Sequence, residues 1–208
     1  MFDLLALVFG PRYWVAHSAV IRLILRLRGL QVGRGFRIEG VPKLKIRGKP
    51  GNVRIGDNVS ILGDIDLRNR ENGCIVFGNN VTIERDCRFV AAREGTIELA
   101  EGAVVTAFAI INAGADVRIG RQSIIGPRAS INSSEHLFTR GVPIRELGFR
   151  HAPIIIEEDC WLASNVVINK GVRLARGTVV GAQSVVTKDT EEFGIYVGIP
   201  ARKIAERE

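Results

Sequence analysis

Residues 156–186 have the sequence IEEDCWLASNVVINKGVRLARGTVVGAQSVV, in which an apolar residue returns at every sixth position. The anchors of this period are Ile156, Leu162, Ile168, Leu174, Val180 and Val186. A period of six matches neither an α-helical turn of about 3.6 residues nor the two-residue alternation of a strand alone. Each hexad is therefore predicted to be a short strand followed by a turn, with its anchor pointing inward. Because one hexad cannot bury its anchor alone, the hexads must stack into a solenoid of parallel strands.

The same rhythm occurs earlier in the chain, with less regularity. Its anchors are Ile55, Ile61, Leu67, Phe77, Ile83, Phe89, Leu99, Val105, Ile111, Ile119, Ile125 and Ile131. Three anchors precede turns that tolerate the unusual backbone angles of a corner, namely Gly56-Asp57-Asn58, Gly78-Asn79-Asn80 and Gly120-Arg121-Gln122. A β-sandwich would show spacings of about 8 to 12 residues instead. The sequence thus predicts an all-β repeat domain over residues 51–199.

The composition fits a single domain of many small turns in a reducing compartment. The 208 residues include 23 Gly and only 6% aromatic residues, which disfavours a helical bundle. The cysteines Cys74, Cys87 and Cys160 are odd in number and form no C-x-x-C pair. Neither a disulfide framework nor a zinc site is expected, and a cytoplasmic location fits best.

The net charge of +7 is concentrated near the N-terminus. Residues 1–54 hold eleven Arg and Lys against Asp3 and Glu39, so the rest of the chain is close to neutral. A nearly neutral repeat body with few aromatic residues is a poor nucleic-acid binder. No nucleic-acid partner is expected.

Residues 1–50 are predicted to form an N-terminal helix and a lead-in. The opening MFDLLALVFG is apolar but lacks the basic region of a cleaved signal peptide. A helix is expected from Pro11 to Leu27, ended by Gly29. Its narrow polar stripe consists of Ser18, Arg22 and Arg26. Two arginines argue against a membrane span, so the helix caps the repeat body, packs on a neighbouring subunit or lies in a membrane interface.

The period breaks between Ile131 and Ile154, and His136 lies in this loop of residues 132–154. A long excursion from a rigid solenoid is where functional groups tend to lie. An imidazole that titrates near neutrality is suited to act as a general base. Glu135 is a candidate for orienting the ring. His17 and His151 are expected to be structural or surface residues, and for His151, which ends the same loop, contact with substrate stays open.

From about Gly51 to Arg202 the chain resembles the left-handed parallel β-helix acyltransferases, which include galactoside, maltose, xenobiotic and serine acetyltransferases. Its style is most similar to sugar O-acetyltransferases of surface-polysaccharide biosynthesis. The resemblance is carried by INSSEH (131–136), VPIRELGF (142–149), IEEDCWLAS (156–164), VVINKGV (166–172), VGAQSVVTKD (180–189) and GIPAR (198–202). It implies a left-handed coil, although general chirality rules would favour a right-handed crossover. A short C-terminal helix or tail is expected over residues 200–208.

The resemblance also implies direct acetyl transfer from acetyl-CoA, with His136 as the base and with no metal. The pantetheine arm would lie along the C-terminal coils, and the nucleotide phosphates would meet cationic side chains. The donor-binding candidates are Ala163, Ser164, Ala182, Thr187, Lys188 and Arg202. The acceptor-binding candidates are Asn112, Glu135 and Trp161, the last equally consistent with a structural aromatic residue. In relatives the site lies between two subunits of a trimer, so a homotrimer with intersubunit sites is expected.

The acceptor is expected to be a saccharide, small or lipid-linked, acetylated on a hydroxyl at or near the inner face of the membrane. Acetylation of an amino sugar would use the same mechanism and stays open. Leu162-Ala163 stands where relatives usually have Ile-Gly, and Glu135 where they usually have Asn. Asn112 is the nearest counterpart of their upstream Asn.

Two rival functions would use the same solenoid. A gamma-type carbonic anhydrase needs three imidazoles around a metal, and His17, His136 and His151 are too scattered to supply them. A non-enzymatic scaffold would need neither His136 nor a cationic C-terminal edge, and it would not bind CoA.

Overall fold

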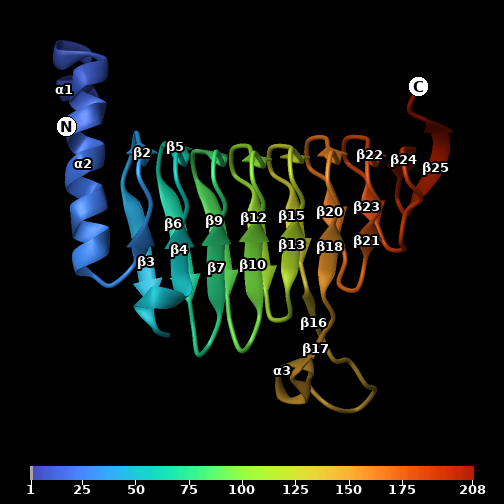
Figure 1. Cartoon of the computed structure of the whole chain (residues 1–208). Coiled ribbons are helices and arrows are strands. Elements are labelled where there is room, and N and C mark those ends of the chain that lie inside the picture. The colour runs from blue at the N-terminus through green and yellow to red at the C-terminus, as the bar shows by residue number, and fades with distance from the viewer. Residues whose placement is uncertain (1) are drawn as a thin grey trace.

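The computed structural model describes residues 2–208 and is a left-handed parallel β-helix closed by helices at one end and by a hairpin at the other (Figure 1). Sheet A contains β1 (Gln31–Val32), β4 (Val53–Ile55), β7 (Cys74–Phe77), β10 (Thr96–Leu99), β13 (Val117–Ile119), β18 (Ile154–Ile156) and β21 (Arg173–Leu174). Sheet B contains β2 (Arg37–Ile38), β5 (Ser60–Leu62), β8 (Thr82–Glu84), β11 (Val104–Val105), β14 (Ile124–Ile125), β19 (Trp161–Leu162), β22 (Val179–Val180), β24 (Gly194–Gly198) and β25 (Ala201–Glu206). Sheet C contains β3 (Pro42–Ile46), β6 (Ile65–Asn69), β9 (Cys87–Ala91), β12 (Ile110–Ala113), β15 (Ser130–Asn132), β20 (Val167–Ile168) and β23 (Val185–Val186).

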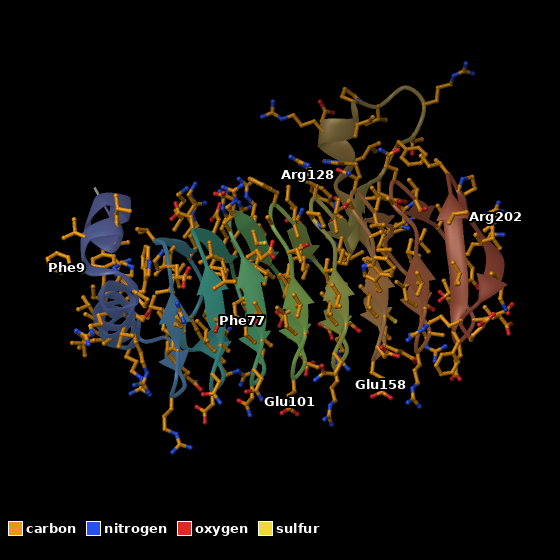
Figure 2. The ribbon with its side chains drawn as sticks, turned by 90° about the horizontal axis from the view of Figure 1, so that it is seen from above. Phe9, Phe77, Glu101, Arg128, Glu158 and Arg202 are labelled. Carbon is orange, nitrogen blue, oxygen red and sulfur yellow. The ribbon has the colours of Figure 1, made fainter. Side chains whose placement is uncertain are left out.

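The predicted anchors point inward and form one continuous core. Ile61, Ile83 and Val105 lie side by side in sheet B, and all three are buried. The rings of Phe77 and Phe89 pack edge to face inside the coil with their centroids 5.1 Å apart, and Figure 2 shows Phe77 in this interior. Burying one such side chain contributes about 1.5–3 kcal/mol. The stacked anchors are therefore the main source of stability, and the parallel pairing excludes a β-sandwich.

The predicted turns form corners with left-handed backbone angles. Asn58, Asn80 and Gln122 have φ values of 56°, 58° and 57°. Asn occupies this region more readily than most residues other than glycine. The turn chemistry predicted for these three positions is confirmed.

The coils differ in length, and the difference is concentrated at one corner. Ile156 lies beside Leu174, 18 residues later, which equals three hexads. Phe77 lies beside Leu99, 22 residues later, and Leu99 beside Ile119, 20 residues later. The extra residues lie where sheet C leads into sheet A. We call this the long corner; it comprises residues 70–73, 92–95, 114–116 and 133–153.

Helix α2 (Pro11–Leu27) covers the N-terminal end of the coil, and α1 (Phe2–Phe9) packs on α2. Gly10 joins the two helices, and the bounds of α2 agree with the predicted helix. The backbone N–H of Ile38 in the first coil donates to Ser18 Oγ over 2.9 Å. Of the three placements considered for this helix, capping of the repeat body is confirmed. None of the helices that the structure describes is long and apolar enough to cross a membrane.

Two of the expected boundaries were wrong. The solenoid begins at Gln31 rather than at residue 51, because Gln31 and Val32 already pair with Arg54 and Ile55. The extra residues before β4, which include a 3-10 turn at Pro50–Asn52, interrupt the six-residue rhythm and conceal the first coil. The expected C-terminal helix is instead strand β25, which pairs antiparallel with β24. Pairing with β24 satisfies the backbone groups of this short segment, which is too short to be a stable helix alone.

Candidate active site

The loop of residues 133–153 leaves the long corner of the fifth coil and projects from the body (Figure 1). Strands β16 (Ser134–His136) and β17 (Phe149–His151) form an antiparallel ribbon, and the four-residue helix α3 (Ile144–Leu147) lies beyond them. Ser133 fastens the start of the ribbon. Its fully buried hydroxyl accepts hydrogen bonds from the N–H groups of Gly114 and Ala115, both over 3.0 Å. The ribbon is thus anchored to the preceding coil.

His136 stands on the exposed ribbon and borders a pocket of about 630 Å³. Its ring packs against Phe149, the residue opposite it in the ribbon, with 4.1 Å between the ring centroids. Within residues 2–208 neither ring nitrogen of His136 has a hydrogen-bond partner in this structure. Phe149 therefore holds the ring, while the nitrogens stay available to a bound molecule.

Asn112 lines the same pocket from the outer face of sheet C. It pairs with Asn132, the last residue of β15, so it lies next to the point where the loop begins. The structure therefore brings together three of the residues proposed from the sequence, His136, Asn112 and Glu135.

Two arginines form the far wall of this pocket. Arg70 and Arg93 belong to the long corner of the second and third coils, and both are exposed. No carboxylate of residues 2–208 lies within 4.0 Å of either guanidinium in this structure. By contrast, Arg118 and Arg176 on the other faces have carboxylates at 3.1 Å and 3.2 Å. The pocket therefore presents two cationic groups without an ion-pair partner among the described residues, beside the carboxylate of Glu71.

His151 supports the base of the ribbon. Its Nδ1 lies 2.8 Å from Ser134 Oγ, the residue opposite it in the ribbon. Gly114 lies directly beneath this pair, since a Cβ at that position would come within 2.4 Å of Ser134 Oγ and 2.5 Å of His151 Nδ1. The ribbon can lie this close to the coil only because residue 114 has no side chain.

The carboxylate of Glu135 is directed to a lysine rather than to His136. Glu135 Oε1 lies 3.3 Å from Lys170 Nζ, whose side chain is 18% exposed. Adjacent residues of a strand point to opposite faces, which separates Glu135 from the His136 ring. The structure does not support the ring-orienting role considered for Glu135. Its ion pair with Lys170 instead connects the ribbon to the sixth coil.

The donor-binding candidates lie on the C-terminal coils, on both sides of sheet C. Ala163, Ser164 and Ala182 occupy the corner between sheets B and C on two successive coils, where Leu162 pairs with Val180. Thr187 and Lys188 follow β23 at the opposite corner. Lys188 and Arg202 border one pocket of about 230 Å³, and Figure 2 shows Arg202 at the C-terminal end of the molecule. These six residues therefore divide into a backbone-lined group and a cationic group.

Trp161 lies on the outer face of sheet B and is 50% exposed. It pairs with Ile124 and Val179, so three apolar residues form a ladder across successive coils. It does not border the His136 pocket of this chain. A contact of Trp161 with acceptor would require a neighbouring subunit.

The cysteines offer no nucleophile at this site. All three are free, and Cys87 and Cys160 are buried among the anchors of the coil. Desolvation by burial raises the pKa of each of these two thiols to about 11. They therefore remain protonated near neutrality. Among residues 2–208 no group of three His, Cys, Asp or Glu side chains is arranged to hold a metal ion.

Several site residues were not found from the sequence. Phe149 could have been found from the alternation of β17 against β16, which places it opposite His136. Ser133 could have been suspected because it is a small polar residue at the point where the six-residue period ends. The sequence does not indicate Arg70 and Arg93 as site residues, because their position in the pocket depends on the lengths of the intervening coils.

Comparisons with known proteins agree with the hexapeptide-repeat fold. Residues 153–188 match the family described as bacterial transferase hexapeptide (six repeats). The chain is 30% identical over 163 residues to the dTDP-4-amino-4,6-dideoxy-D-glucose acyltransferase of Escherichia coli, which covers 76% of this chain and 83% of that protein. It is 35% identical over 91 residues to the galactoside O-acetyltransferase of Escherichia coli strain K12, covering 43% of this chain and 44% of that protein.

A solved structure shares the fold. A variant of AntD, an N-acyltransferase from Bacillus cereus in complex with dTDP-4-amino-4,6-dideoxyglucose and coenzyme A, superimposes with a TM-score of 0.63. Its identity to this chain is 21%, and the match covers 90% of this chain and 89% of that one. At this identity the likeness concerns the fold.

Proposed function

This chain belongs to the hexapeptide-repeat acyltransferases, and from that premise we propose that it transfers an acetyl group from acetyl-CoA to a hydroxyl of a saccharide, with His136 as general base. The observation that carries the proposal is the position of His136. Its ring is held by Phe149 at the edge of a pocket, and its nitrogens have no partner among residues 2–208. A base with these properties can reach an acceptor hydroxyl without breaking an existing hydrogen bond.

The proposed reaction is a direct transfer. A ring nitrogen of His136 takes the proton of the acceptor hydroxyl as its oxygen attacks the thioester carbonyl. The tetrahedral intermediate collapses, the carbon–sulfur bond breaks, and the imidazolium returns the proton to the departing CoA thiolate. Asn112 lies across the pocket, where its amide can bind another hydroxyl of the saccharide. No residue of the chain needs to be acetylated, which agrees with the buried state of Cys87 and Cys160.

Acetyl-CoA is the proposed co-substrate, bound along the C-terminal coils. The small residues Ala163 and Ala182 leave backbone groups accessible to the pantetheine amides, and Ser164 adds a hydroxyl beside them. Thr187, Lys188 and Arg202 are proposed to bind the phosphates. A point charge and a planar guanidinium that border one pocket suit two phosphate groups.

A homotrimer with intersubunit sites is the proposed assembly. The ladder of Ile124, Trp161 and Val179 presents apolar side chains on the outer face of sheet B, where a second copy could cover them. Covering them would also allow a neighbouring Trp161 to border the acceptor pocket. The three free cysteines support the reducing conditions of the cytoplasm as the working environment.

Acetylation of an amino sugar is the second candidate. It is favoured by the similarity to the Escherichia coli acyltransferase, of which 83% is covered and which by name acts on dTDP-4-amino-4,6-dideoxy-D-glucose. A base at His136 would serve an amine that enters as ammonium equally well.

The test is acetyl-CoA turnover by the purified chain against nucleotide sugars, amino sugars, neutral monosaccharides and lipid-linked saccharides. His136→Ala should lower kcat by about 10² to 10⁴ while leaving CoA binding intact. His17→Ala is the control, an imidazole outside this pocket whose Nε2 lies 2.9 Å from Gly40 O. Unchanged turnover in His136→Ala would refute the mechanism, and absence of CoA binding by the wild type would favour a scaffold.

A further inference from the structure

We propose that the outer face of helices α1 and α2 is a docking surface for an anionic lipid bilayer, on which the coil stands by its N-terminal end. We call this face the end surface. It comprises Leu7, Val8, Phe9, Val15, Val20, Leu23, Ile24 and Leu27. The proposal concerns a surface remote from the His136 pocket and does not depend on the proposed reaction.

Helix α2 is apolar on both sides, because Leu25 is buried in the core and Ile21 packs against it, while polar groups also face the coil. A helix on a protein surface usually turns its apolar side inward. Here the buried Ser18 hydroxyl donates to Trp14 O over 2.6 Å and accepts from Ile38 N over 2.9 Å. His17 Nε2 lies 2.9 Å from Gly40 O, and Arg22 Nε is buried. The polar groups of α2 are thus used against the coil, and a second set of apolar side chains is left facing outward.

The side chains of the end surface are unusually exposed. Their exposed fractions run from 43% for Ile24 to 81% for Leu7. Val20, Leu23, Ile24 and Leu27 have the spacing i, i+3, i+4, i+7, so they lie on one side of the helix. Figure 2 shows Phe9 at the extreme end of the molecule, away from the coil. A continuous apolar face of this kind is the mark of an interaction surface rather than of scattered exposed residues.

The charge around the end surface favours a bilayer as the occupant. From Pro11 to Arg28, the length of α2 and its C-cap, the sequence contains four arginines and no acidic residue. Arg12 and Arg28 are exposed at the two ends of α2, which places positive charge at both borders of the apolar face. An apolar face bordered by cations binds in the interface of a membrane that contains anionic lipids.

The same charges disfavour a second copy of the chain. Two end surfaces packed together would bring arginines against arginines, with no carboxylate on α2 to compensate them. Self-association would therefore bury apolar area at the cost of like-charge repulsion. The lipid surface supplies negative charge where a second copy supplies positive charge.

The position of the helices sets the orientation of the docked protein. Helix α2 covers one end of the coil with α1 at its tip, and the loop with His136 leaves the fifth coil (Figure 1). At about 4.8 Å per coil the pocket lies on the order of 20 Å from the first coil. Docking thus places the pocket above the bilayer surface rather than within it.

The experiment is flotation of the full chain with vesicles of phosphatidylcholine alone and of phosphatidylcholine with about one third phosphatidylglycerol. The wild type should float with the anionic vesicles, and binding should weaken as salt is raised. The variant Val20→Ser/Leu23→Ser/Leu27→Ser should lose at least about tenfold in partitioning. Arg12→Gln/Arg28→Gln should lose binding to anionic vesicles while leaving the apolar face in place.

The matched control is Phe138→Ser/Ile144→Ser, which removes two exposed apolar side chains from the loop. It should float like the wild type, and circular dichroism should show all variants folded. Wild-type protein that stays with the soluble fraction would overturn the proposal, as would equal flotation with both vesicle types. A smaller oligomer for the serine triple variant in sedimentation, without any vesicle binding by the wild type, would assign the face to a second copy instead.

Discussion

The second and third coils differ from the sixth and seventh at one corner and on one face. In the early coils the long corner holds extra residues, and the outer face of sheet C carries charged side chains. Asp66 pairs with Arg88 there, and Asp66 Oδ2 also accepts from Arg68 over 2.5 Å. In the late coils the corner is tight, and the equivalent positions hold Val167 and Val185.

This difference shows how one repeat supports two kinds of binding. Where three hexads close a coil, the surface is regular and offers backbone groups and small side chains, which suits a long ligand that crosses several coils. Where residues are added, side chains from coils far apart in sequence meet around one pocket. We therefore expect the acceptor at the long corner and the donor along the tight coils.

The largest effect is expected from converting the loop into a tight corner. Ile131 pairs with Ile168, so Asn132 and Asn169 hold equivalent positions in successive coils. After Asn169 the corner consists of Lys170 and Gly171 alone, which shows that two residues are enough to close it. Replacing residues 133–153 by the dipeptide Lys-Gly should lower acetyl transfer by at least about 10³. Binding of CoA, measured by calorimetry, should remain.

The cost in stability of this excision can be separated from its effect on activity. Loss of the Ser133 hydroxyl leaves the N–H groups of Gly114 and Ala115 without their partner, which should cost about 1–3 kcal/mol. Ser133→Ala in the intact loop should show this destabilisation while keeping measurable turnover. An excised protein that is folded and as active as the wild type would place the reaction elsewhere.

The regular part of the fold could be predicted from the sequence, and the irregular part could not. The anchors of residues 156–186 follow from a six-residue period, and the helix Pro11–Leu27 follows from the proline that begins it and the glycine that ends it. Both predictions are confirmed. The first coil was missed because residues 47–52, with their 3-10 turn, separate its hexads from those of the second coil. The direction of the Ser18 stripe was not predictable either, because it depends on a hydrogen bond to Ile38, which lies 20 residues away.

The candidate site divides in the same way. His136 could be proposed because a broken period and a family resemblance both point to it. Arg70 and Arg93 could not, since only the 22-residue length of the early coils brings them to the same corner as the loop. The register between coils depends on the length of each coil, and it cannot be predicted from the types of the individual residues.

An intermediate effect is expected at the tight coils. Lys188→Ala/Arg202→Ala removes the two cations that border the C-terminal pocket, and the KM for acetyl-CoA should rise about tenfold. The value of kcat should change less than about twofold, because neither residue is proposed to contact the reacting atoms. Arg118→Ala, an exposed arginine on sheet A, is the control. A fall in kcat with an unchanged KM would contradict the assignment of donor to these coils.

The smallest effect is expected from the charged face of the early coils. Hydrogen bonding from Arg68 lowers the pKa of the Asp66 carboxyl below its usual range, with Arg88 contributing by charge. The unfolded chain binds the proton more tightly than the folded chain, so Asp66 stabilises the fold near neutrality and ceases to do so as the pH falls through its lowered pKa. Asp66→Asn should therefore lower the Tm by about 1–3 °C at pH 7, and the difference from wild type should vanish in acid.

Thermal unfolding from about pH 7 to pH 2 measures this difference. Asp86→Asn is the control, because within residues 2–208 no cation lies within 4.0 Å of the Asp86 carboxylate, and Asn suits its φ of 59°. This control should follow the wild type at every pH. A gap between Asp66→Asn and wild type that stays constant down to the lowest pH would show that Asp66 acts through packing of its side chain. The charged face would then contribute to stability in the same way as Val167 and Val185 do in the late coils.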